Sequence, residues 1–205
     1  MQRVEKLPPA FKRFRRAGGA FLFAAFDGAE ESEAAALNAI GALLNGDLDV
    51  EKLRAIGHRK VTETEFLGAH CEAGSRTIVQ RGSWETGDGR RLVDPPLKKL
   101  DGVRIRSGGY GMADPGEGGQ FARAFAFPPY GLHARPGEIQ SLFDEILDFL
   151  LPPGTESHIL DWTSPRLGEV SPWFDAGMEW WGAFLFTIHQ PPSGRLIAMA
   201  ASTTD

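Results

Sequence analysis

The chain has 205 residues, and its 22 basic and 27 acidic side chains give a formal net charge of −5 at neutral pH. A hydrophobic content of 42% in a chain of this length excludes general disorder and allows a core that needs neither a disulfide nor a structural metal. The one cysteine, Cys71, excludes an intramolecular disulfide, and no segment approaches the roughly 18 apolar residues of a membrane-spanning helix, so we expect a cytoplasmic protein that binds no membrane.

The first part of the chain combines a basic segment with an apolar one. Residues 1–16 carry six bases and one acid, a composition typical of a basic N-terminal arm. Residues 19–26 are apolar and flanked by glycines, which predicts a buried strand. Asp27 then predicts the N-cap of a helix that ends near Leu44, with Glu30 as its capping-box partner.

The middle of the chain predicts short elements separated by glycine and proline. Asp49 predicts the N-cap of a helix over residues 50–56. Four segments have the composition of strands, namely residues 60–71, 76–81, 103–107 and 120–127. Residues 107–119 are rich in glycine and predict a flexible loop.

The last part of the chain gives the clearest patterns. Apolar residues recur at helical spacing over residues 137–151, which predicts a helix with one buried stripe, and residues 157–163 predict a short strand. Two apolar runs, residues 179–189 and 195–202, are joined by a proline- and glycine-containing loop and predict a β-hairpin. Both alternating faces of the first run are apolar, so we expect that strand in the middle of a sheet. Together these elements predict a single α+β domain with a mainly antiparallel sheet, packed by two principal helices.

No catalytic motif is recognisable in the sequence. The Gly109-Tyr110-Gly111 run lacks the third glycine of a dinucleotide-binding fingerprint, and there is no Gly-x-Ser-x-Gly elbow. Cys71 directly follows His70, and neighbours on a strand point to opposite faces, so we expect a buried, inert thiol. The five histidines show no metal-binding spacing, and we expect no metal and no cofactor. The negative total charge argues against nucleic-acid binding.

Acidic residues dominate the end of the chain. Residues 136–205 carry ten acids and two bases, a net charge of −8, and the outward acids of the 137–151 helix have no lysine or arginine three or four residues further on. Such acids can pair with cations of residues 52–135 inside the fold, confer solubility, or form a docking surface for a basic partner. The candidate contact residues are Glu138, Asp144, Glu145, Asp148, Asp161, Glu169, Asp175 and Glu179, with Trp173 as an aromatic anchor.

Two functional hypotheses follow from these patterns. The first is a non-enzymatic inhibitor of the immunity or antitoxin class, which would neutralise a basic bacterial toxin through the acidic surface; this is an analogy at the level of protein class. The alternative is an enzyme, a hydrolase or transferase, with residues gathered under the 107–119 loop. Its candidate residues are His133, His158, Asp161, Glu179 and His189. A concave pocket that holds at least two of them within about 3 Å of each other, with an oxyanion donor nearby, would favour the enzyme, whereas a flat or convex acidic face would favour the inhibitor.

Overall fold

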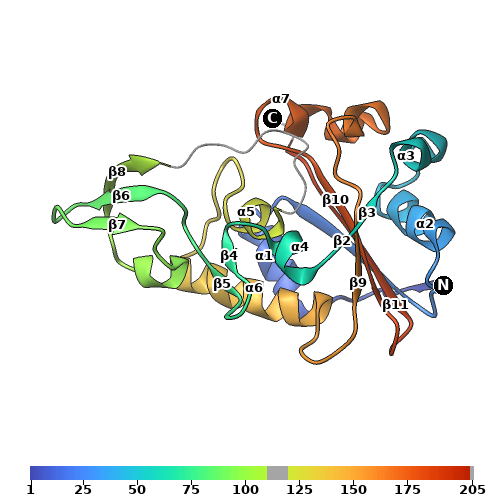
Figure 1. The fold of residues 1–205 in the computed structure, drawn as a ribbon, viewed down its shortest axis with the longest axis horizontal. Helices are drawn as coiled ribbons and strands as arrows, with labels where there is room; N and C mark the ends of the chain where they lie inside the picture. The colour runs from blue at the N-terminus through green and yellow to red at the C-terminus, as the bar shows by residue number, and fades with distance from the viewer. Residues whose placement is uncertain (110–119, 204–205) are drawn as a thin grey trace.

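A computed structural model of the chain describes residues 1–109 and 120–203, with Trp180 described by its backbone only. Its centre is a six-stranded antiparallel sheet, drawn in Figure 1. The strands follow one another across the sheet in the order β1 (Gln2–Arg3), β2 (Phe21–Asp27), β11 (Arg195–Ala201), β10 (Phe184–Gln190), β9 (His158–Asp161) and β3 (Arg59–Val61). Helices cover both faces, which confirms the predicted α+β class and the mainly antiparallel sheet.

The C-terminal hairpin occupies the middle of the sheet, as predicted. All seven residues of β10 are buried, and β10 pairs with β11 on one side and β9 on the other. The expected strand is nevertheless too long at its start, because residues 175–180 form a helix, α7 (Asp175–Trp180). Gly182 adopts a positive φ of 132° between the helix and the strand, a conformation that suits glycine and lets the chain change direction. The apolar run alone does not reveal this boundary.

One face of the sheet is covered by four helices, which are α1 (Pro9–Arg16), α4 (Glu63–Leu67), α5 (Phe121–Ala126) and α6 (Pro136–Leu150). Aromatic rings fill the space between them: Phe14 stacks on Phe125 with ring centroids 4.2 Å apart, and Phe143 meets Phe125 edge-on at 5.2 Å. The helix predicted over residues 137–151 is α6. Residues 1–16 do not form a detached arm, because β1 extends the sheet and α1 buries Phe11 and Phe14.

The opposite face is covered by α2 (Glu33–Leu43), α3 (Val50–Ile56), α7 and two short 3₁₀ turns, η2 (Leu167–Glu169) and η3 (Pro172–Phe174). Helix α3 begins after Asp49, as predicted. The N-cap of α2 is Ser32 and not Asp27, because the Ser32 hydroxyl accepts a hydrogen bond from the Ala35 amide at 3.1 Å. Asp27 is instead the last residue of β2 and forms an ion pair with Arg195 at 2.8 Å.

Two predicted strands in the middle of the chain are wrong. Residues 120–127 form helix α5, which is buried on every side and therefore shows no helical periodicity in its sequence. Residues 60–71 are divided between β3, helix α4 and β4 (Cys71–Glu72), with a capping box between Thr62 and Glu65 that starts the helix.

The remaining elements form two small sheets. β4 pairs with β5 (Thr77–Ile78), and β7 (Arg91–Val93), β6 (Ser83–Thr86) and β8 (Ile105–Gly109) form a three-stranded sheet at the far left of Figure 1. The 3₁₀ turn η1 (Leu97–Leu100) connects this sheet to the main body and packs on α6. Most of the predicted glycine-rich loop, residues 110–119, lies outside the described residues. None of the described helices combines the length and apolarity that crossing a membrane requires.

Candidate functional site

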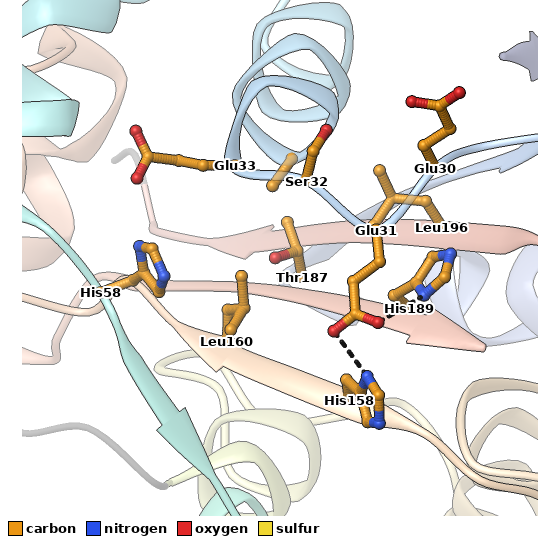
Figure 2. Close-up of a pocket in the computed structure, with 11 residues that line it drawn as sticks. Glu30, Glu31, Ser32, Glu33, His58, His158, Leu160, Thr187, His189 and Leu196 are labelled. Carbon is orange, nitrogen blue, oxygen red and sulfur yellow. Dashed lines mark hydrogen bonds and ion pairs between the residues drawn. The ribbon is translucent and has the colours of Figure 1, made fainter. Parts of the chain in front are cut away.

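A polar pocket lies on the α2 face of the sheet, where α2 leaves the strands uncovered (Figure 2). Its cavity has a volume of about 230 Å³. The floor is formed by side chains of β9, β10 and β11, and the roof by the segment that joins β2 to α2. The lining residues are Glu30, Glu31, Ser32, Glu33, Ala36, His58, His158, Leu160, Thr187, His189 and Leu196. We call this cavity the Glu31 pocket.

Strand register brings two histidines of the Glu31 pocket together. His158 is the first residue of β9 and His189 is the sixth of β10, and the two are direct partners in the antiparallel ladder. Directly opposed residues point to the same face of a sheet and have Cβ atoms about 4.5–5.5 Å apart. The pairing of β9 with β10 therefore places two imidazoles side by side.

Glu31 reaches the same place from the loop before α2. The loop is attached to the tip of the C-terminal hairpin, because the Ala29 amide donates a hydrogen bond to the Gly194 carbonyl at 2.9 Å. The carbonyl of Ala29 lies 3.2 Å from Nε2 of His189. These two contacts, together with the Ser32 cap that starts α2, fix both ends of the short segment that carries Glu31.

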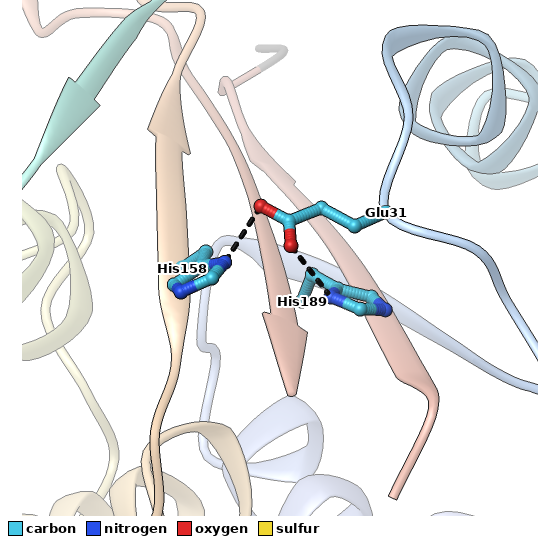
Figure 3. A group of neighbouring side chains, drawn as sticks. All are labelled: Glu31, His158 and His189. Carbon is cyan, nitrogen blue, oxygen red and sulfur yellow. Dashed lines mark hydrogen bonds and ion pairs between the residues drawn. The ribbon is translucent and has the colours of Figure 1, made fainter. Parts of the chain in front are cut away.

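The Glu31 carboxylate lies between the two rings (Figure 3). Its Oε1 is 2.6 Å from Nδ1 of His158, and its Oε2 is 3.9 Å from Nδ1 of His189. The other nitrogen of His158, Nε2, is 3.0 Å from Oε1 of Glu156. Both histidines thus direct Nδ1 toward Glu31 and hold Nε2 on an oxygen outside the group. The nearest ligand atoms of Glu31, His158 and His189 all lie within 4.8 Å of one another.

The hydrogen bond of His189 defines which of its nitrogens is a donor. A backbone carbonyl can only accept, so Nε2 of His189 carries the proton that it donates to Ala29. In the neutral ring Nδ1 is then an acceptor. His189 is only 8% exposed, and its Nδ1 is fully buried without a hydrogen-bond partner among the residues that the structure describes. A lone pair is therefore directed at a carboxylate, which is itself only an acceptor.

Four of the other polar residues of the Glu31 pocket have structural contacts. Thr187 accepts a hydrogen bond from the indole Nε1 of Trp162 at 3.0 Å, and the Ser32 hydroxyl caps α2. Glu33 forms an ion pair with Arg54 at 3.2 Å. His58 lies at the end of the pocket away from His158 (Figure 2), with its ring 4.3 Å from that of Trp162.

Two of the five residues named for the enzyme hypothesis line the Glu31 pocket, His158 and His189, and among the described residues they meet through Glu31 rather than through a hydrogen bond to each other. Asp161 lies on the same strand as His158 but on the opposite face, where it is buried and paired with Arg59 at 3.2 Å. His133 and Glu179 do not line the pocket. The expected lid does not lie over this site in its described part, because residues 107–109 belong to β8 in the separate sheet (Figure 1). Sequence reasoning did not find Glu31.

Half of the eight candidate acids of the inhibitor hypothesis already have a cation from the same chain. The pairs are Glu145 with Arg13 at 2.5 Å, Asp148 with Arg76 at 3.1 Å, Asp161 with Arg59 at 3.2 Å, and Glu169 with Arg166 at 2.8 Å. Arg59 and Arg76 belong to residues 52–135, so pairing with the cations of that segment accounts for two of these four acids.

The other four acids, Glu138, Asp144, Asp175 and Glu179, form no ion pair with any residue that the structure describes. Glu138 and Asp144 are on α6, whereas the other two are on α7, and these helices cover opposite faces of the sheet (Figure 1). The candidate acids therefore do not form one continuous surface. Trp173 is half-buried and packs edge-on against Phe174 at 5.0 Å.

The thiol of Cys71 is buried, as predicted. Burial raises its pKa to about 12, so it is protonated at neutral pH and a poor nucleophile. Burial also lowers the pKa of the neighbouring His70 to about 4, and this ring is directed at the Val79 carbonyl rather than at the thiol.

Comparisons of the chain with protein-family models, curated proteins and solved structures found no match. Its function is therefore inferred from the Glu31 pocket itself.

Proposed function

We propose that this chain is a hydrolytic enzyme whose active site is the Glu31 pocket, and that Glu31, His158 and His189 together activate a water molecule there. The observation that carries the proposal is the convergence of two imidazoles on one carboxylate inside a cavity of about 230 Å³. The histidine and carboxylate chemistry is that of the enzyme hypothesis drawn from the sequence, but the third member, Glu31, comes from the loop before α2.

Stability alone does not account for this arrangement. A buried polar atom without a hydrogen bond costs about 1–3 kcal/mol, and Nδ1 of His189 is such an atom within the described part of the chain. Glu30, Glu31 and Glu33 also place three carboxylates around one cavity, and within the described ranges only Glu33 has an arginine partner. Buried polar atoms without partners and clusters of like charges occur mainly at functional sites.

The pocket favours hydrolysis over a covalent mechanism. Its two hydroxyl groups, on Ser32 and Thr187, already accept structural hydrogen bonds, and neither forms a hydrogen bond with a histidine that the structure describes. Water is then the nucleophile: it adds to the acyl carbon of an ester or amide, loses a proton to the site, and the proton is returned to the departing alcohol or amine. The carboxylates repel anionic substrates, so we infer a neutral or cationic acyl compound, lying along Thr187 and Leu160 toward His58 (Figure 2).

The test is a comparison of hydrolytic rates on small chromogenic substrates. The panel contains neutral p-nitrophenyl esters and aminoacyl p-nitroanilides, with p-nitrophenyl phosphate as the anionic comparison. We expect turnover of a neutral or cationic substrate, no turnover of the phosphate, and a loss of about 10²–10⁴-fold in Glu31→Gln and His158→Ala, the usual contribution of a group that moves a proton. Glu30→Gln is the matched control, since it removes one charge from the pocket lining outside the group of three.

Two results would count against the enzyme. One is a folded wild-type protein, tested with and without added divalent metal, that turns over no ester or amide. The other is a turnover that Glu31→Gln and Glu30→Gln reduce equally, because the rate would then depend on the charge of the pocket and not on the group of three.

The inhibitor hypothesis is the second candidate, and the observation that favours it is the pair of exposed acids without ion-pair partners on α6, Glu138 and Asp144, among the described residues. Reversing both to lysine would weaken the capture of a basic toxin, whereas the same reversal of Asp175 and Glu179 on α7 is the control for a change in total charge. Equal binding by both double variants would refute docking through α6.

A further inference from the structure

We propose that Glu31, His158 and His189 are the ligands of one zinc-class divalent metal ion, held by two imidazole Nδ1 atoms and one carboxylate oxygen. This inference deepens the proposed function, since it names the group that would activate water, and it rests on the same pocket. The group of three meets the requirement of donor chemistry, because imidazole and carboxylate together suit zinc and related first-row metals.

The protonation pattern of the two rings calls for a cation at this point. Nε2 of His189 donates to Ala29, so the lone pair of Nδ1 faces Glu31. His158 lies between Glu31 and Glu156, two carboxylates that only accept, yet a neutral ring carries a single N–H. A proton on Nε2 satisfies Glu156 and leaves Nδ1 facing Glu31 as an acceptor. Three acceptor atoms then converge, and one divalent cation satisfies all of them.

The surroundings of the rings are those of metal-binding histidines. Histidine ligands almost always donate their second ring N–H to a carboxylate, a backbone carbonyl or a water, which fixes the tautomer and the orientation of the ring. Here Glu156 takes that position for His158, at 3.0 Å, and the Ala29 carbonyl takes it for His189, at 3.2 Å. An imidazolium held by carboxylates accounts for His158 but not for the buried, unpartnered Nδ1 of His189.

The two Glu31 contacts need only small adjustments to match a tetrahedral site, and all three ligand atoms already lie within 4.8 Å of one another. With metal–ligand bonds of about 2.1 Å, two ligand atoms of a tetrahedral ion lie about 3.4 Å apart. The Glu31–His158 contact of 2.6 Å must open, while the Glu31–His189 separation of 3.9 Å must close slightly. Glu31 is on a loop and its side chain is 51% exposed, so it can make both adjustments without moving the strands.

Three protein ligands leave a fourth position free, which is the pattern of catalytic rather than structural zinc sites. A zinc ion in such a site lowers the pKa of its bound water to about 7, and a hydroxide is thereby supplied at neutral pH. The metal would replace direct proton transfer by His158 as the means of activating water in the proposed reaction.

The experiment measures binding without relying on turnover. The purified chain is stripped with a chelator and titrated with Zn²⁺ by calorimetry, and with Co²⁺ while the visible spectrum is recorded. We expect one ion per chain and the intense visible bands of four-coordinate Co²⁺. Glu31→Gln and His189→Gln should weaken binding by more than the roughly 10–100-fold loss that removal of an outer partner causes, and Glu156→Gln should fall within that range. Glu30→Gln should bind as the wild type does.

A second measurement needs no variant that could fail to fold. Long-range ¹H–¹⁵N correlation spectra of the wild type report the tautomer of each histidine, and addition of Zn²⁺ should shift the Nδ1 signals of His158 and His189 while their Nε2 atoms stay protonated. Failure of the stripped protein to bind Zn²⁺ or Co²⁺ would overturn the metal site, as would equal weakening by Glu31→Gln and Glu30→Gln. Binding without turnover would refute the enzyme but not the metal, and turnover that survives the chelator would refute the metal but not the enzyme.

Discussion

Replacing His189 by leucine separates the cost of this residue in folding from its use in binding. Loss of the hydrogen bond to Ala29 leaves a buried carbonyl without a partner, a cost of about 1–3 kcal/mol. The same change removes the unpartnered Nδ1, which itself costs about 1–3 kcal/mol in the wild type. The two effects have opposite signs and similar size. We therefore expect the free energy of unfolding of the metal-free variant to lie within about 1 kcal/mol of that of the metal-free wild type. This difference is smaller than the usual penalty for losing a buried polar side chain.

Zinc should separate the two proteins. An ion that binds only the folded state at 1,000 times its dissociation constant adds about 4.1 kcal/mol, which for a chain of this size raises the melting temperature by about 8–16 °C. We expect this shift in the wild type and none in His189→Leu, measured by urea and thermal unfolding with and without Zn²⁺. An equal shift in both proteins would show that zinc binds elsewhere, and a variant that is several kcal/mol less stable without metal would refute the assignment of a strained Nδ1.

Three further predictions concern a hydrogen bond beneath the site and the titration of Cys71 and Asp144. Thr187→Val removes the acceptor of the buried Trp162 indole and should lower the free energy of unfolding in urea by about 1–3 kcal/mol. Combining it with Trp162→Phe should cost less than the sum of the two single losses, because both remove the same hydrogen bond. An unchanged free energy of unfolding in Thr187→Val would contradict this bond. Cys71 should resist alkylation in the native protein at neutral pH and react only on unfolding, because burial raises the pKa of its thiol to about 12; rapid labelling of folded protein would refute this. Asp144 is exposed as a residue, but partial desolvation of its carboxyl raises its pKa, so its protonated form stabilises the fold at low pH and this contribution is lost as the pH rises through the raised pKa. Asp144→Asn should therefore be the more stable protein at pH 7, with the advantage vanishing below the ordinary carboxyl pKa of about 3.9. If the advantage of Asp144→Asn over the wild type instead grows at low pH, folding lowers the pKa of Asp144 and this reasoning is wrong.

Two elements were predictable from the sequence: α6, which leaves one side exposed, and the C-terminal hairpin, whose loop separates two apolar runs. Helix α6 buries one stripe, and its apolar residues recur at the helical period, while Pro136 favours its start and Pro152 prevents its continuation. The hairpin of β10 and β11 was predictable because its loop carries proline and glycine between two apolar runs. In both cases the local preferences of the sequence agree with the tertiary structure, so the sequence pattern predicts the element.

Two short helices in the middle of the chain were not predictable in the same way. Helix α5 has six buried residues out of six, including Arg123, so no polar face marks its period and the segment resembles a buried strand. Helix α4 is too short to show a period, although the spacing of Thr62 and Glu65 is a capping-box signal that could have revealed it. For short buried segments the decision between helix and strand is made by tertiary packing.

The candidate site has two parts, and only one of them could be deduced from the sequence. The pairing of His158 with His189 could have been deduced, because antiparallel alignment of two predicted strands places the start of one beside the end of the other. The position of Glu31 could not, because placing the N-cap at Asp27 puts Glu31 inside a helix. The actual cap at Ser32 leaves residues 28–31 as a loop, and that loop is held by a hydrogen bond from Ala29 to the hairpin tip more than 160 residues away along the chain.

The loop that carries Glu31 is attached to the hairpin through Ala29, and this attachment couples the positions of the three side chains. Ala29 contacts Gly194 through its amide and His189 through its carbonyl, so one residue positions the carboxylate and orients one of the rings. Lengthening the 191–194 turn by one residue would displace the loop without touching any of the three side chains. We expect such an insertion to weaken Zn²⁺ binding while leaving the strand pairing of β10 with β9 intact, as judged by amide hydrogen exchange; unchanged zinc affinity would show that Glu31 does not depend on this attachment.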